Sequence, residues 1–185
     1  MKKLLLVLFI SLGLIGSANA NSIQGAFGYN LGDIYETSDK TISHKFIPKK
    51  LFPGLDDYLI ITGVDNRIVT ISAEKIKWES SGYYCNDRDY SGFRQLLKLL
   101  QTKYGQFEKI LDERKEYADG TSEEAEYKYE DGDRNIDLYC DSNYVNGTGF
   151  YRLFLKYQDT VLNNQLIEDI NEASKNSDSE MMLDL

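Results

Sequence analysis

Several residue types that build catalytic and metal sites are scarce in this chain. Its 185 residues include one histidine, one tryptophan, two prolines and two cysteines. With His44 as the only imidazole and no C-x-x-C pair, the chain lacks the donors of an ordinary zinc site and the motif of a thiol oxidoreductase. No serine lies in a nucleophile-elbow pattern, and we expect His44 to be a surface residue in a short extended segment. The sequence therefore predicts no catalytic residue, no metal site and no cofactor.

Positive charge is also in short supply. The chain has 21 basic and 30 acidic residues, a formal charge of -9, and no basic cluster. Phosphate contacts need clustered lysine and arginine, so we expect no nucleic-acid partner and little attraction to anionic lipid. A basic protein or a cation would be attracted, although the charge also serves simply to keep a secreted domain in solution.

The acidic stretch after Tyr129 partly resembles a calcium-binding loop. Asp131, Asp133 and Asn135 alternate as in an EF-hand loop, but Ile136 stands where that loop requires glycine. We therefore interpret Asp131-Gly132-Asp133 as a hairpin turn with acidic flanks.

Only one long apolar run exists, and it lies at the N-terminus. Two lysines precede the run from Leu4 to Ile15, and Ala18-Asn19-Ala20 follows it. This order is typical of a signal peptide, and the run is short of the ~20 residues that span a bilayer. An uncleaved anchor is the alternative. We expect residues 1–20 to be cleaved before Asn21, leaving a periplasmic or secreted bacterial protein with no stable membrane insertion.

Export of the protein would also determine the state of its two cysteines, Cys85 and Cys140. An even pair in an oxidising compartment usually closes into a disulfide. The predicted bond would close a loop of about 55 residues, which the chain-entropy estimate values at roughly 4 kcal/mol.

The apolar periodicity predicts an α+β domain over residues 21–174 with an antiparallel sheet. The predicted order is hairpin, helix, meander and second C-terminal helix, followed by a flexible acidic tail over 175–185. Asp89 or Ser91 is expected to cap the first helix and Gly105 to end it. The predicted strands span 58–62, 67–73, 107–111, 126–130, 136–140 and 151–157, and the predicted helices span 89–104 and 160–174.

Two aromatic residues are expected to point away from the core on adjacent meander strands. Ile136, Leu138 and Cys140 point inward by alternation, so Tyr139 points outward, as does Phe154 on the next strand. Tyr139 and Phe154 are therefore our candidates for an exposed surface patch. The alternative is that the C-terminal helix buries them.

Four short segments occur in a familiar order. They are the Gly25-Ala-Phe-Gly-Tyr-Asn-Leu-Gly32 opening, Phe52-Pro-Gly-Leu-Asp-Asp-Tyr58, Ile71-Ser-Ala73, and a helix that ends in Lys103-Tyr-Gly105. Over residues 25–105 the chain resembles a loose group of small secreted bacterial proteins with no established activity. The resemblance implies an α+β fold and no particular chemistry.

Taken together, these features favour an exported, non-enzymatic binding module that acts on a protein or envelope component. Such a module could be an inhibitor, an immunity protein or an envelope accessory factor. The alternative is an envelope hydrolase that uses paired carboxylates, because acidic residues are plentiful.

Overall fold

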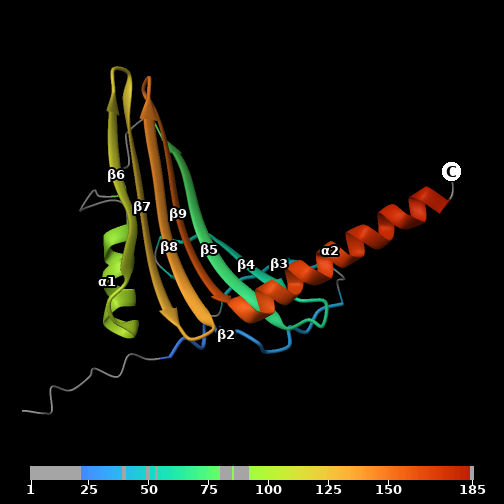
Figure 1. Cartoon of the computed structure of the whole chain (residues 1–185). Coiled ribbons are helices and arrows are strands. Elements are labelled where there is room, and N and C mark those ends of the chain that lie inside the picture. Colours follow the sequence, from blue (N-terminus) through green and yellow to red (C-terminus); the bar gives the residue numbers. More distant parts are fainter. Residues whose placement is uncertain are drawn as a thin grey trace, which may run out of the picture.

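A seven-stranded antiparallel sheet dominates the computed structural model, which describes residues 22–38, 41–48, 51–52, 54–79, 85 and 92–183. The predicted signal peptide and its cleavage site lie outside the described residues. The strand order is β3-β4-β5-β9-β8-β7-β6 (Figure 1). The strands of this sheet are β3 (Ser43–Lys45), β4 (Asp57–Thr62), β5 (Ile68–Glu79), β6 (Glu108–Tyr117), β7 (Gly120–Asp131), β8 (Arg134–Val145) and β9 (Thr148–Asp159).

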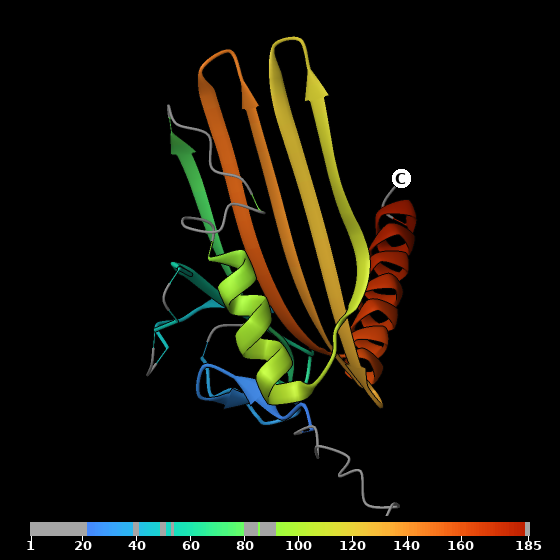
Figure 2. The ribbon, with the colours of Figure 1, turned by 90° about the vertical axis from the view of Figure 1, so that its left-hand side faces the viewer.

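Two helices and a small hairpin complete the predicted α+β fold. Helix α1 (Phe93–Tyr104) packs on one face of the sheet, beside the hairpin of β1 (Gly25–Ala26) and β2 (Tyr29–Asn30) (Figure 2). Helix α2 (Thr160–Leu183) follows β9 and extends away from the sheet (Figure 1). No helix in the described part of the chain is both long and apolar enough to cross a membrane.

Alternation along the strands separates a buried face from an open one. On β9, Tyr151, Leu153, Leu155 and Tyr157 are buried, and the residues between them are half-buried. The predicted inward residues of β8 are fully buried on the same face. Helix α1 covers this face with four buried side chains, namely Phe93, Leu96, Leu100 and Tyr104.

The predicted disulfide is present and staples this buried face. Cys85 is bonded to Cys140, with the Cα atoms 5.7 Å apart and both residues fully buried. That separation lies within the ordinary range for a disulfide. The bond therefore ties the connection between β5 and α1 to the centre of the sheet.

Five strands, β5 to β9, are longer than the apolar pattern predicted. Strand β5 continues to Glu79 because Lys75-Ile76-Lys77-Trp78 keeps alternating and pairs with β9 as far as Gly149. Strands β6 and β7 form one long hairpin in place of two short predicted strands. Strand β6 lies at the edge of the sheet and is exposed along almost its whole length, so it has no apolar period to detect.

The prediction that His44 lies on the surface is wrong, because its side chain is buried. It is only 7% exposed, since its register partner Ile60 faces the core and cross-strand partners share a face. Its Nε2 lies 3.4 Å from the Thr62 hydroxyl, and its ring centroid lies 5.0 Å from that of Tyr35.

The start of α1 and the end of α2 differ from their predicted positions, whereas the end of α1 and the start of α2 agree with them. Gly92, with φ 68°, occupies the N-cap position of α1 without a side-chain cap, and the predicted caps lie outside the described residues. Gly105 ends α1 with a positive φ, as predicted. The backbone of α2 continues to Leu183, beyond the predicted end at Ser174, because the sequence from Thr160 onward has no glycine or proline to stop it.

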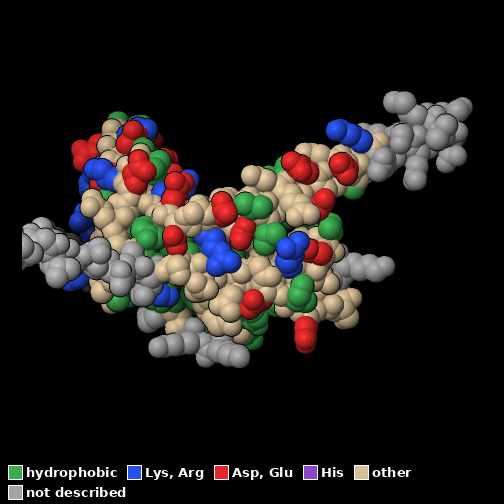
Figure 3. All heavy atoms as spheres, turned by 60° about the horizontal axis from the view of Figure 1, so that its bottom comes forward, with side chains coloured by type: hydrophobic (Ala, Val, Ile, Leu, Met, Phe, Trp, Pro, Cys, Tyr) green, Lys and Arg blue, Asp and Glu red, His purple; other side chains and the backbone are tan. Residues whose placement is uncertain are grey.

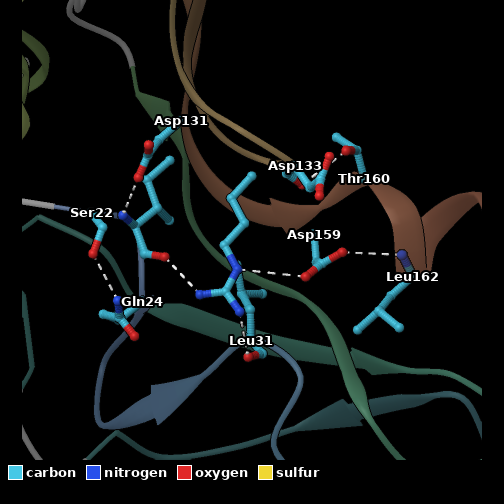
Figure 4. Close-up of polar contacts among 10 residues, drawn as sticks. Ser22, Gln24, Leu31, Asp131, Asp133, Asp159, Thr160 and Leu162 are labelled. Atoms are coloured by element: carbon cyan, nitrogen blue, oxygen red, sulfur yellow. Dashed lines mark hydrogen bonds and ion pairs between the residues drawn. The ribbon is translucent and has the colours of Figure 1, made fainter.

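Arg134 joins the start of the described chain to Asp159, the residue before α2 (Leu31 and Asp159 are labelled in Figure 4). Its guanidinium donates hydrogen bonds to the carbonyl oxygens of Ile23, at 2.7 Å, and Leu31, at 3.2 Å. Its Nε also lies 3.5 Å from the Asp159 carboxylate. The other Asp159 oxygen accepts a hydrogen bond from the Leu162 N–H at 3.1 Å, which caps α2.

Candidate functional site: the open face of the sheet

The face of the large sheet opposite α1 is the candidate site, and we call it the open face. Helix α2 contacts β5 and β9 and then leaves the sheet, so the outward side chains of the central strands keep access to solvent (Figure 1). The open face consists of the outward residues of the four central strands. They are Glu74, Ile76 and Trp78 of β5, Phe150, Arg152, Phe154 and Lys156 of β9, Asp137, Tyr139, Asp141 and Asn143 of β8, and Ser122, Glu124, Glu126 and Lys128 of β7.

The two predicted patch residues meet at the centre of this face. Tyr139 and Phe154 are direct cross-strand partners, and both are half-buried. The Arg152 guanidinium lies 5.2 Å from the centroid of the Phe154 ring, in cation–π contact. Arg152 also pairs with the Glu74 carboxylate at 3.1 Å, which fixes its plane over the face.

A second aromatic pair lies further along the face, near the outer end of the sheet. Trp78 and Phe150 are register partners on β5 and β9, with ring centroids 4.8 Å apart. Trp78 is 70% exposed, although it is a large apolar residue and the only tryptophan of the chain. Exposed aromatic side chains beside an arginine have the composition of a protein-binding hot spot.

Acidic groups lie between the two aromatic pairs. Asp141 faces Arg152 on one side and Glu124 on the other in the strand register. Burial raises the pKa of the Asp141 carboxyl, Glu124 raises it further, and Arg152 opposes both effects. Burial likewise raises the pKa of the Tyr139 hydroxyl, with Asp141 and Glu124 adding to the shift. The face therefore holds negative charge that is only partly neutralised.

Paired charges cross the sheet near α2. The Lys156 ammonium lies 2.8 Å from the Asp137 carboxylate, and the next partner of Asp137 in the register is Lys128. Figure 3 shows acidic and basic side chains intermixed on the underside of the molecule, with acidic side chains along α2. This end of the open face is thus balanced in charge, whereas the end near Glu124 is acidic.

Two shallow depressions mark the open face. One, of about 540 Å³, is lined by Trp78, Phe150, Asp141 and Glu124, among others. The other, of about 290 Å³, lies over Arg152, Phe154 and Lys156. Both belong to one continuous surface that carries aromatic, cationic and anionic groups together.

The long edge strand β6 is protected against pairing with another strand. It carries charges of both signs along Glu113-Arg114-Lys115-Glu116 and has a bulge between Lys109 and Leu111. Charges and bulges on an edge strand block the addition of another strand. The broad face, rather than the edge, is therefore the surface suited to a partner.

The carboxylates of the open face do not have the enclosed arrangement that a hydrolase uses. Asp141 and Glu124 form a carboxylate pair, but both side chains are half-buried on an open sheet face rather than enclosed in a cleft. Among the described residues no group of three or more His, Cys, Asp or Glu side chains could hold a metal ion.

Sequence reasoning found the centre of the open face and missed its outer half. Tyr139 and Phe154 were recognised because they alternate with a strongly apolar row. Trp78 was missed because β5 was predicted to end at residue 73. The alternation of lysine with Ile76 and Trp78 was the signal that could have extended the strand.

The chain was compared with known proteins by family, by sequence and by structure. No family model matches it, and no curated protein or solved structure gives a significant match.

Proposed function

We propose that this protein is an exported, non-enzymatic binding module that holds a protein partner on its open face. The observation that carries the proposal is that the half-buried Tyr139, Phe154 and Arg152 share one sheet face with the exposed Trp78. A large apolar side chain that is 70% exposed, on the same face as an arginine in cation–π contact with a phenylalanine, is typical of an interaction surface.

The charge of the face favours a basic partner. Asp141 is the register partner of Glu124, Glu126 is the partner of Tyr139, and the whole chain carries a formal charge of -9. Complementary charge speeds association and selects the partner. An inhibitor, an immunity protein or an envelope accessory factor would each use such a surface.

Export is the second part of the proposal, with residues 1–20 as the cleaved signal peptide. The Cys85–Cys140 bond supports it, because structural disulfides belong mainly to oxidising compartments. The Ile23 N–H donates to the Asp131 carboxylate at 3.0 Å, so the third residue after the proposed cleavage site is bound to the fold (Asp131 in Figure 4). N-terminal sequencing of the protein from a periplasmic fraction should begin at Asn21. Retention of residues 1–20 would reject export by this signal.

Affinity capture with matched variants tests the binding surface. Trp78→Ala removes the exposed ring, and Val64→Ala is its control because Val64 is also 70% exposed but lies in the turn between β4 and β5. Wild type and Val64→Ala should retain the same proteins from a native envelope extract, and Trp78→Ala should lose one of them. Equal capture by all three proteins, with equal melting temperatures, would reject the open face as the binding surface.

A hydrolase remains the alternative because Asp141 and Glu124 are neighbouring carboxylates and the pKa of the Asp141 carboxyl is raised by burial. A glycosidase needs two carboxylates on opposite sides of the scissile bond. These two lie side by side on one sheet face, and this favours binding over hydrolysis.

A further inference from the structure

The depression of about 540 Å³ near the outer end of the open face, which we call the outer depression, brings an aromatic wall and two carboxylates together. Trp78 and Phe150 form its aromatic side. Asp141 and Glu124 are register partners and line the same depression. Phe150 lies diagonal to Asp141, because its own partner on β8 is Asn143. Diagonal neighbours lie within reach of long side chains, so one such side chain can touch both the ring and the carboxylates.

The two carboxylates of the outer depression carry charge that the protein does not pair. In the part of the chain that the structure describes, neither Asp141 nor Glu124 takes part in an ion pair or a side-chain hydrogen bond. Arg152, the partner of Asp141 on β9, is engaged with Glu74 at 3.1 Å. Lys115, on the edge strand, is engaged with a glutamate of its own strand at 3.0 Å. The depression therefore presents negative charge for a cation from outside.

Half-burial makes this charge costly until a cation arrives. Asp141 and Glu124 are both half-buried, so each has lost part of its hydration. Burial and the neighbouring Glu124 both raise the pKa of the Asp141 carboxyl, while Arg152 lowers it. A cation held between the two carboxylates would offset both unfavourable effects.

We propose that the outer depression receives an arginine side chain of the protein partner, an inference that rests on the binding function proposed above. The guanidinium lies between the Asp141 and Glu124 carboxylates. The aliphatic stem lies against the rings of Phe150 and Trp78, as the stems of long cationic side chains lie on apolar surface. Charge complementarity supports this occupant, because the chain carries a formal charge of -9.

Arginine fits this lining better than other cations do. Its planar guanidinium presents five N–H donors, which suffice for two carboxylates and for the Asn143 amide oxygen beside them. It is also less strongly hydrated than a lysine ammonium and stacks on aromatic rings, so it enters a half-buried aromatic site at lower cost.

Titration of the full chain with acetyl-argininamide tests the site, with the fluorescence of Trp78, the single tryptophan, as the signal. We expect saturable binding with a dissociation constant on the order of 1 mM, which is typical of so small a ligand. Acetyl-citrullinamide has nearly the same shape without the charge and should bind at least about tenfold more weakly. Acetyl-lysinamide should bind at least about threefold more weakly. Equal binding of either control compound, or no saturable change, would overturn the proposal.

Three variants locate the site. Glu124→Gln and Asp141→Asn should each weaken acetyl-argininamide by about fivefold or more, because each removes one charged acceptor. Glu168→Gln makes the same change of charge at an exposed position of α2 and should leave the affinity unaltered. Melting temperatures establish that all three variants are folded. Equal affinities of the three variants would overturn the site.

Affinity capture separates this inference from the binding function on which it rests. The protein that wild type captures and Trp78→Ala loses should also be lost by the double variant Glu124→Gln with Asp141→Asn, and Glu168→Gln should retain it. Full retention by the double variant would overturn the arginine site and leave the open face as the binding surface. Capture of nothing by wild type would instead reject the binding function and its partner, while the titration still decides whether the depression binds a guanidinium.

Discussion

Asp141 is the residue of the open face whose chemistry is most altered by its surroundings. Its carboxyl is half-buried between Arg152 and Glu124, and its pKa is raised, first by burial and then by Glu124. The folded protein therefore binds the Asp141 proton more readily than the unfolded chain does. The ionised carboxylate opposes folding above its folded-state pKa, and this opposition disappears as the pH falls to its unfolded value of about 3.9.

Replacing Asp141 by asparagine should accordingly stabilise the protein at neutral pH. We expect Asp141→Asn to raise the free energy of unfolding at pH 7 by less than about 1 kcal/mol, since solvent screens the half-buried group. The gain should shrink toward pH 4. Urea denaturation at the two pH values measures it, with Asp137→Asn as control because Asp137 is paired with Lys156 at 2.8 Å and should lose stability instead. A loss of stability in Asp141→Asn at pH 7 would show that Arg152 outweighs burial.

At the scale of elements, the stability of helix α2 depends mainly on contacts made by its first turn. Asp159 caps the helix through the Leu162 N–H and also meets Arg134, and Leu166 is the buried residue that follows. Beyond Leu166, Ile167 and Ile170 are 49% and 44% exposed. Helical stability in proteins comes mostly from packing, so the cap matters more where packing is sparse.

Loss of this cap should be measurable. Asp159→Ala should lower the free energy of unfolding by about 1 kcal/mol. Asp159→Asn keeps an oxygen that can accept from Leu162, so it should cost less. Circular dichroism during urea denaturation compares the two. Equal losses would assign the role of Asp159 to its ion pair with Arg134 rather than to capping.

The disulfide acts at the same scale by joining two elements. Cys85→Ser and Cys140→Ser each remove a closed loop of 55 residues, and we expect a loss of roughly 4 kcal/mol. The double variant should cost about as much as either single variant, because both remove the same bond. Denaturation of the variants, and of the wild type under reducing conditions, would test this. A loss below about 1 kcal/mol would mean that the bond does not stabilise the fold.

Elements with a buried side were predictable from the sequence, and those without one were not. The apolar residues of β8 and β9 alternate along the sequence, and those of α1 recur at helical spacing. Both patterns predicted the corresponding elements. Strand β6 was predicted only as far as residue 111, because Glu108 to Tyr117 is exposed along almost its whole length and owes its conformation to pairing with β7. His44 was misplaced for a related reason, since which side of a three-residue strand faces the core depends on its partner.

At the scale of the whole molecule, the two faces of the sheet have different roles. One face is closed by α1 and the disulfide, and the other presents aromatic and charged groups to solvent (Figures 1 and 2). The candidate site could be predicted only at Tyr139 and Phe154, because the face is assembled by registers that join residues as distant as Trp78 and Phe150. A single sequence does not reveal these registers.

Binding of a basic partner to an acidic face should depend on salt. We expect the captured partner to be released as ionic strength rises, mainly through slower association, because screening acts over about 8 Å at physiological salt. Release measured between low and high salt tests this. Affinity that does not change with salt would mean that the aromatic residues, without the acidic groups, hold the partner.

The central claim is that a partner covers the open face, and Trp78 reports on it directly. Because the chain has one tryptophan, labelling with 5-fluorotryptophan gives a single ¹⁹F resonance in an otherwise silent native extract. As a control, Val64→Trp keeps Trp78 in place and adds a second ¹⁹F resonance at a site off the face. We predict that the Trp78 resonance shifts or broadens when the extract is added and that the control resonance does not. An unchanged Trp78 resonance under conditions in which the protein captures its partner would contradict the account.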